Sequence, residues 1–346
     1  MKAVILGARG FDLLEENLAE TFHYMGHEAA VVDVYQDLPV FSRLGKRTLH
    51  TLMRANYGFS VRLWKSAARD VVEHNPDLVI VTDREVVPEA IVHLKQQLRD
   101  IPIVHLNPDH AGNLGRQYIL MSPYDALVTK EPFLADSIKR LYGAKAFYLP
   151  ESFNPRVHVK PVSPKATVEA DMNVDLIVIA SLNPYRVRFL ESLLKCLPSH
   201  LRISIYGSSK PMPWVGGRLR QFHGNRYLVG AEKARAFYGA KIALNTMHPA
   251  EFHGVNCRFF EALGSGAFLL TEDRPVIVDL AVPDEEVVTF RDVQEAASKI
   301  QYYLDHDSER LAIAEAGYRR ALRDHTYEKR IEAMLAMLDG GAKAAT

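Results

Sequence analysis

The chain has 346 residues, enough for about two domains, with 48% hydrophobic and 24% charged residues, values typical of a globular protein. Its 42 basic residues balance 42 acidic ones, which argues against a broad basic face for nucleic acid, and its two cysteines exclude a disulfide scaffold. No run reaches the roughly 18 apolar residues that span a bilayer, so we expect no membrane span and a cytoplasmic protein.

The first half alternates short apolar runs with amphipathic segments. Continuous apolar runs are typical of parallel strands that are buried on both faces, and the segments between them are spaced as helices. We predict strands over residues 3–6, 29–32, 78–81, 103–106 and 126–129. We predict helices over residues 88–98 and 131–141.

Residues 151–172 interrupt this rhythm with prolines and no periodicity, and the same rhythm then starts again. The second half predicts strands over residues 174–180, 202–206, 241–245 and 267–271, a helix over 185–197 and a long helical stretch over 308–338. The fold class expected is therefore α/β, with two Rossmann-like parallel-sheet domains facing a cleft. The boundaries expected are 1–155 for the first domain, 156–172 for a linker, 173–320 for the second domain and 321–346 for a C-terminal helix.

Two strand ends of the first half carry candidate groups. The first strand runs into Gly7-Ala8-Arg9-Gly10, where Gly10 allows a ligand to approach the backbone, or simply makes a tight turn. A later strand ends at Asp109 and His110, either of which could act as general base on an acceptor hydroxyl. The alternative is a turn stabilised by Asn and Asp side chains. Asp83 has the same two interpretations with a weaker functional claim.

The most informative stretch is 248–273, HPAEFHGVNCRFFEALGSGAFLLTED, which predicts a loop, a helix and a strand. Asn256 is a candidate N-cap, and a helix N-terminus attracts anions through its free N–H groups. Arg258 in the first turn adds charge that a phosphate would balance. Glu261 lies on the same helix face and could accept hydrogen bonds from two ribose hydroxyls; the alternative is a surface ion pair with Arg258.

Arg186 opens the helix that follows the first strand of the second half, where it could reach a pyrophosphate or be solvated. His248 and His253 are five residues apart without a third ligand, so we expect no metal.

At this point the sequence resembles the GT-B-fold glycosyltransferases of the group-1 superfamily, and within them the CgeB-like branch named for spore-maturation proteins. Residues 254–266 resemble that branch's G-x-N-x-R-x-F-E-A-x-A-x-G core, with Gly264 where alanine is frequent. Residues 180–186 resemble its G-S-L-x-x-x-R turn, and residues 325–330 give H-T-Y-x-x-R. Weaker matches are the G-H-E at 26–28 and the interdomain segment 149–155.

The resemblance implies a metal-independent, hexosyltransferase-like enzyme that moves a sugar from a nucleoside-diphosphate donor to an acceptor, with no cofactor. It implies that Glu261 binds the donor ribose, that Asn256 and Arg258 lie near the diphosphate or sugar, and that Arg186 neutralises phosphate charge. The donor-binding residues expected are Gly10, Arg186, Gly207, His253, Gly254, Asn256, Arg258 and Glu261. The C-terminal helix would return to the first domain, which would bind the acceptor.

One departure concerns the two glutamates, separated by seven residues, of retaining group-1 enzymes. Glu261 matches the second, but the first falls on His253, and Glu251 is two positions away. The stereochemical outcome therefore stays open. A nucleotide-sugar epimerase of the same fold and a non-catalytic nucleotide-sugar binding protein are the alternatives.

Overall fold

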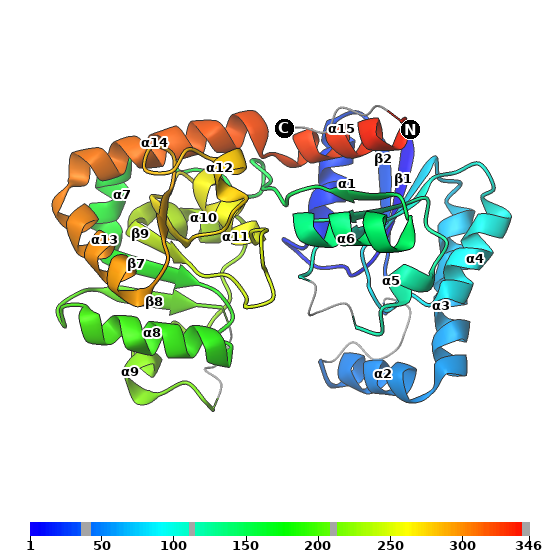
Figure 1. The fold of residues 1–346 in the computed structure, drawn as a ribbon, viewed down its shortest axis with the longest axis horizontal. Coiled ribbons are helices and arrows are strands. Elements are labelled where there is room, and N and C mark those ends of the chain that lie inside the picture. The colour runs from blue at the N-terminus through cyan, green and yellow to red at the C-terminus, as the bar shows by residue number, and fades with distance from the viewer. Residues whose placement is uncertain (36–42, 111–114, 208–212, 341–346) are drawn as a thin grey trace. The chain divides into compact units, whose positions relative to one another are not determined.

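The computed structural model describes residues 1–35, 43–110, 115–207 and 213–340; for residues 43–47 it describes the backbone only. The chain divides into two compact units, Met1–Pro150 with the chain from Ile331 onward, and Glu151–Arg330. Each contains one parallel sheet covered by helices, which confirms the expected α/β class with two Rossmann-like sheets (Figure 1). Among the described helices, none is long and apolar enough to cross a membrane.

The sheet of the first unit has six parallel strands in the order β2-β1-β3-β4-β5-β6. Its strands are β1 (Lys2–Leu6), β2 (Glu28–Val32), β3 (Leu78–Val81), β4 (Ile103–Asn107), β5 (Ala126–Thr129) and β6 (Ala146–Tyr148). Its helices are α1 (Leu14–Tyr24), α2 (Arg43–Ala55), α3 (Tyr57–Glu73), α4 (Pro88–Gln97), α5 (Tyr118–Met121) and α6 (Pro132–Tyr142). The five predicted strands are confirmed, whereas the short edge strand β6 was not predicted.

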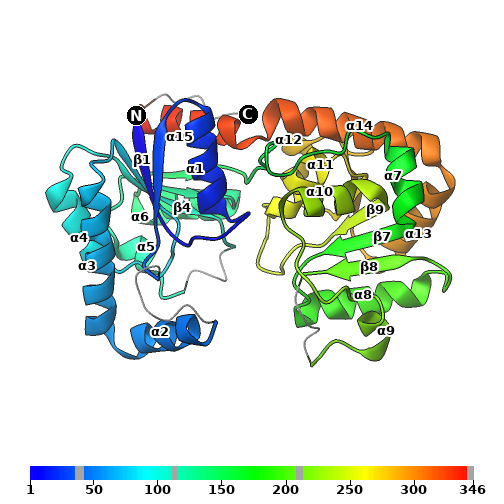
Figure 2. The ribbon, with the colours of Figure 1, turned by 180° about the vertical axis from the view of Figure 1, so that it is seen from behind.

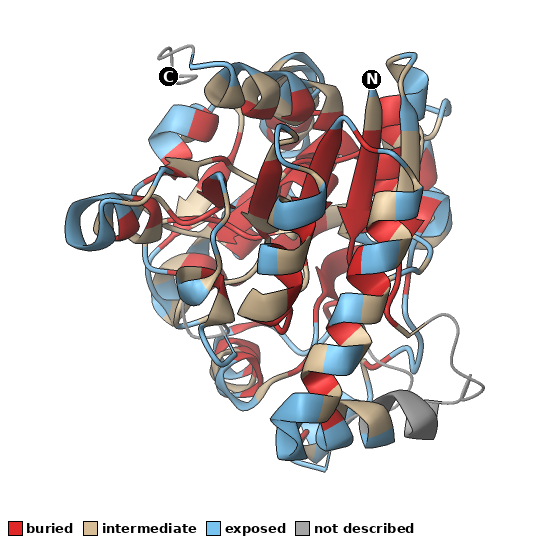
Figure 3. Ribbon diagram, turned by 90° about the vertical axis from the view of Figure 1, so that its right-hand side faces the viewer, coloured by how far each residue is buried: buried red, intermediate tan, exposed pale blue. Residues whose placement is uncertain are grey.

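Burial on both faces explains the apolar strand sequences. Val4, Val79 and Val81 pack with Trp64 of α3 and Leu94 of α4 in one core. On the other face, α1 runs alongside β1 and β2, as Figure 2 shows. Figure 3 shows the strands buried between helices that expose their outer surfaces. The catalytically useful positions are thus left to the loops after each strand.

The sheet of the second unit has five parallel strands in the order β11-β10-β9-β7-β8. Its strands are β7 (Val174–Ile179), β8 (Ile203–Tyr206), β9 (Ala240–Asn245), β10 (Leu269–Glu272) and β11 (Val288–Phe290). Its helices are α7 (Lys165–Met172), α8 (Pro184–Cys196), α9 (Gly217–Arg220), α10 (Gly230–Gly239), α11 (Cys257–Gly264), α12 (Ile277–Leu280), α13 (Val293–Asp305) and α14 (Asp307–Asp324). Strand β11, three residues at the sheet edge, was not predicted.

Two predicted segments differ from the structure. The stretch expected to be a linker includes α7, whose Lys165 pairs with Glu169 at 3.2 Å. The single C-terminal helical stretch is two helices, α14 and α15 (Tyr327–Leu338), because Thr326 forms a β-bridge with Phe153 between them. From Ile331, α15 belongs to the first unit, so the C-terminal helix does return there.

Candidate functional site

The turn after β7 in the second unit places Arg186 at the carboxyl end of the sheet. Asn183 caps α8 by accepting the Arg186 amide at 2.9 Å, and Pro184 takes the first helical position. The Arg186 side chain is 3% exposed and donates to Ser181 O, to Thr246 Oγ1 at 2.7 Å and to Thr246 O at 3.2 Å. The guanidinium is therefore held rigidly by neutral acceptors.

A second guanidinium reaches the same strand end. Arg258, in the first turn of α11, donates to Asn245 Oδ1 at 3.3 Å and to Thr246 O at 3.5 Å. Neither Arg186 nor Arg258 forms an ion pair with a carboxylate of a described residue. Burial, followed by the charge of Arg258, lowers the pKa of Arg186 to about 9. The charges of Glu251 and Glu272 act in the opposite direction but do not offset the burial and the second cation.

The N-terminus of α11 adds polar groups to this position. Asn256 is the N-cap residue, as predicted, but its side chain makes no capping bond and donates instead to Thr246 O at 3.2 Å. Asn256 is 5% exposed, and its buried Oδ1 has no partner among the described residues. The first amides of a helix also lack intrahelical partners, so this end favours negative charge. Together with the arginines it forms a candidate anion site.

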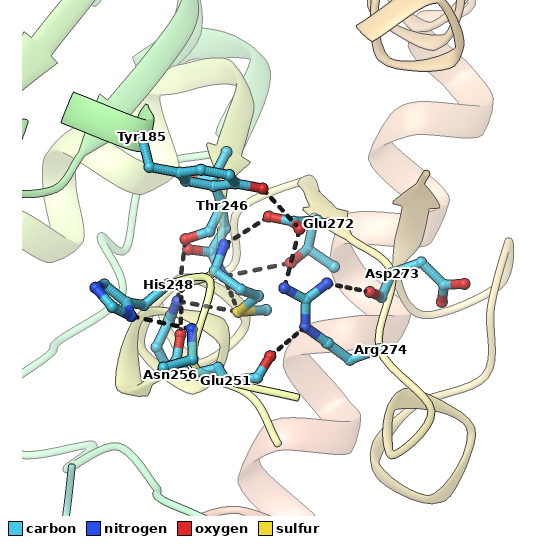
Figure 4. A network of polar contacts seen from close by, with 12 residues as sticks. Tyr185, Thr246, His248, Glu251, Asn256, Glu272, Asp273 and Arg274 are labelled. Carbon is cyan, nitrogen blue, oxygen red and sulfur yellow. Dashed lines mark hydrogen bonds and ion pairs between the residues drawn. The ribbon is translucent and has the colours of Figure 1, made fainter. Parts of the chain in front are cut away.

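Figure 4 shows the polar network that braces the loop before α11. Glu272, at the end of β10, accepts the Met247 amide at 2.9 Å and pairs with Arg274 at 2.9 Å. Tyr185 OH lies 3.5 Å from the same carboxylate. The loop backbone is therefore tied to two neighbouring strand ends.

The same loop is closed on itself. Arg274 donates to Glu251 O at 2.7 Å, and the Glu251 carboxylate accepts the His248 amide at 2.7 Å. Glu251 is 4% exposed, and its carboxylate thus has a structural task in this loop. His253 is half-buried, and its carbonyl accepts the Val276 amide at 3.4 Å. Gly254 is buried.

Glu261 lies one turn beyond Arg258 on α11 but makes no ion pair with it. Its Oε1 accepts from Lys233 of α10 at 2.9 Å and lies 3.7 Å from His158 Nε2. Glu261 is 8% exposed, so the alternative of a solvated surface pair is wrong. Gly207 has φ +142, and a Cβ there would lie 2.2 Å from Ala180 O; its glycine is required for this close approach of two strand ends.

In the first unit, Asp109 lies after β4 and pairs with Arg84. Its amide donates to Asn107 Oδ1 at 3.1 Å, which is the side-chain-stabilised turn considered from the sequence. His110 is half-buried next to it. Gly10 also lies in this unit, in the turn before α1, where its carbonyl accepts the Leu13 amide at 3.1 Å.

Asp83, at the neighbouring end of β3, is the most perturbed carboxylate of this edge. Its Oδ1 accepts the Glu85 amide at 2.7 Å, and burial raises the pKa of Asp83 to about 6. Glu85 pairs with Arg54 at 2.9 Å. Burial and nearby carboxylates, Asp83 first among them, also raise the pKa of Tyr35. A carboxylate with this pKa takes up a proton readily near neutral pH.

Comparisons with known proteins agree with this arrangement. The sequence model of a family described as "Glycosyl transferase-like" matches residues 186–336, which contain Arg186, Lys233, Arg258 and Glu261. No protein of curated function matches the sequence at a significant level.

Solved structures resemble nearly the whole chain. Sucrose-phosphate synthase from Thermosynechococcus elongatus has a TM-score of 0.67 at 13% identity, over 98% of each chain. A glycosyltransferase from Rickettsia africae has a TM-score of 0.67 at 12% identity, over 99% of this chain and 98% of that one. HepE from Anabaena, in complex with UDP-glucose, has a TM-score of 0.67 at 13% identity, over 98% and 100%. The fold is GT-B.

Sequence reasoning missed three groups of the second unit. Glu272 and Arg274 could have been found, because they directly follow a predicted strand, where parallel sheets carry their sites. Lys233 had no signal, since it lies within a helix that no motif marks. Only the packing of α10 beside α11 brings it to Glu261.

Proposed function

We propose that this protein is a metal-independent glycosyltransferase that transfers a sugar from a nucleoside-diphosphate donor to an acceptor hydroxyl. The observation that carries the proposal is the convergence of Arg186, Arg258 and the α11 N-terminus on Thr246 without a carboxylate partner. A diphosphate would supply the negative charge that balances these two arginines. The family model over residues 186–336 and the GT-B fold support the same reaction class.

The second unit would hold the donor, with Glu261 accepting from the ribose. When the acceptor oxygen attacks the anomeric carbon, the bond from that carbon to the diphosphate oxygen breaks and the electron pair leaves with the diphosphate. The two guanidinium groups would stabilise this developing charge, the task that a metal ion performs elsewhere. Gly207, His253, Gly254 and Asn256 would shape the same donor site.

The first unit would bind the acceptor and supply the base. Asp109 and His110 follow β4 as the sequence suggests, but Asp109 is paired with Arg84. Asp83 has the pKa that suits proton uptake, and we propose it beside them as general base. We further propose a hexosyl donor, a place in the CgeB-like branch on the motif at 254–266, and work in the cytoplasm.

The test is calorimetric titration of the protein with pyrophosphate and with UDP, GDP, dTDP, CDP and ADP, each with Mg²⁺ and with EDTA. We expect one nucleotide to bind equally with and without metal. Arg258→Met should lower the affinity for this nucleotide and for pyrophosphate about 10- to 100-fold, the usual contribution of hydrogen bonds to charged groups. Arg202→Met, which removes an arginine paired with Asp175 at the other end of the sheet, is the control and should leave binding unchanged.

Failure of every nucleotide and of pyrophosphate to bind would overturn the proposal. Binding without turnover of any sugar donor, by transfer or hydrolysis, would favour a binding protein instead.

A further inference from the structure

Two buried charges of the second unit form a pair whose geometry leaves one oxygen unused. Lys233 and Glu261 are each 8% exposed, and Lys233 Nζ lies 2.9 Å from Glu261 Oε1. His158 Nε2 lies 3.7 Å from the same oxygen. Glu261 Oε2 has no donor among the described residues and is not sealed from solvent. Lys233 and His158 therefore both approach one side of the carboxylate.

Burial makes this one-sided pairing consequential. A carboxylate with so little contact with water takes up a proton unless a cation or hydrogen bonds hold it ionised. Lysine does so as a compact point charge on one oxygen, whereas arginine binds both carboxylate oxygens with its fork. With a lysine at position 233, Oε2 of Glu261 stays available.

The orientation of the pair is set by packing. Lys233 comes from α10 and Glu261 from α11, helices that lie against each other on one side of the sheet (Figure 2). Arg258, one turn before Glu261, is directed instead to Asn245 and Thr246. The anion site and the free carboxylate oxygen are thus offered from successive turns of one helix.

We propose that Lys233 is a positioning residue that makes Glu261 a selective acceptor for the vicinal diol of a ribonucleotide, so that the site discriminates against 2′-deoxyribonucleotides. This inference rests on the proposed function, because it assumes that a nucleoside diphosphate binds there. The inference goes beyond the proposed function because it assigns ribose selectivity to Lys233, a residue that does not touch the ligand.

The experiment measures affinities of the full-length protein for UDP and 2′-deoxy-UDP, GDP and 2′-deoxy-GDP, ADP and 2′-deoxy-ADP, and pyrophosphate. The wild type should prefer the ribonucleotide about 10- to 100-fold, as expected for hydrogen bonds to a charged acceptor. Glu261→Gln and Lys233→Met should each reduce this preference to about threefold or less while pyrophosphate affinity changes little. Lys233→Arg should also reduce it, because its fork occupies Oε2, and it keeps the charge in case Lys233→Met does not fold.

Two further arms distinguish positioning from mere stability. Lys233→Met should not lower the preference further in a Glu261→Gln background, since it acts through that carboxylate. Lys165→Met removes another buried lysine, paired with Glu169 at 3.2 Å on α7, and should cost stability without changing the preference.

An unchanged ribonucleotide preference in both Lys233 variants would overturn the inference, and so would an equal loss of pyrophosphate and nucleotide binding. Failure of the wild type to bind pyrophosphate or any nucleotide would instead refute the proposed function.

Discussion

The carboxyl edges of the two sheets differ in how their charged side chains are partnered. In the first unit, carboxylates follow three adjacent strands: Glu15 accepts from Thr82 Oγ1 at 2.6 Å, Asp33 from the Arg9 amide at 2.9 Å, and Glu85 from Arg54. In the second unit, the corresponding edge carries Arg186 and Arg258. Among the described residues, their guanidinium N–H groups donate only to neutral oxygens.

The difference shows that one sheet architecture can present differently partnered groups at its carboxyl edge. The carboxylates of the first unit already accept hydrogen bonds from protein groups, and Asp83 is the one whose pKa is raised to about 6. The arginines of the second unit have no counter-ion among the described residues. Under the proposed function, the first edge would take the acceptor hydroxyl and the second the diphosphate.

The largest expected effect comes from neutralising the carboxylate edge at Asp83. Asp83→Asn should lower kcat about 100- to 10,000-fold, the usual contribution of a general base, and leave nucleotide affinity unchanged. The wild-type kcat/KM should fall as pH drops below about 6, because Asp83 becomes protonated. Asp109→Asn is the comparison: a larger loss there would assign the proton transfer to Asp109 instead.

The same variant should also change stability, with a definite sign. The folded pKa of Asp83 lies above its ordinary value of 3.8, so its stabilising proton is fully bound below about pH 4 and lost as pH rises through 6. At pH 7–8 Asp83→Asn should therefore stabilise the fold by on the order of 1–3 kcal/mol, measured by urea unfolding. Unchanged stability and activity together would refute this account of the edge.

The next effect is a loss of stability at low pH, caused by His325, which packs on helix α11. Burial, with the charge of Arg330, lowers the pKa of His325 to about 4, and its ring packs on Phe260 of α11 at 5.1 Å. The neutral imidazole of His325 stabilises the fold fully above pH 6.5. This contribution, about 3 kcal/mol, is lost as the pH falls to 4. His325→Gln should make the free energy of unfolding, measured in urea, depend less on pH between 4 and 6.5. An unchanged pH dependence would contradict a buried neutral imidazole at position 325.

The smallest effect tests how closely α11 is packed. A Cβ on Gly264 would lie 2.3 Å from the Phe153 ring, which is fully buried, so this position requires glycine. Gly264→Ala should cost about 1–3 kcal/mol in urea unfolding and weaken pyrophosphate binding, because α11 must shift. Gly217→Ala, where a Cβ meets nothing within 4 Å, is the matched control and should cost nothing. Equal stability of the two variants would show that α11 yields without strain.

Sequence periodicity was most informative for buried strands. The run at 78–81 matches β3 residue for residue, because a strand covered on both faces must be apolar throughout. The edge strands β6 and β11, three residues each, carry too short a pattern to be recognised. The placement of two arginines near strand ends was also foreseeable, since Arg186 and Arg258 each follow a strand whose end the pattern predicts; that they bind an anion stays a prediction.

The sequence by itself determined the two parallel sheets, their strand ends and the arginines that lie there, because burial periodicity and helix starts are local properties of the chain. Tertiary structure alone decided which charges are balanced: Asp109 by Arg84, Glu261 by Lys233, and Arg186 by no carboxylate of the described residues. The two ion pairs join residues 25 and 28 positions apart in sequence, Asp109 and Arg84 through the pairing of β3 with β4 and Glu261 and Lys233 through the packing of α10 on α11, which no local pattern encodes.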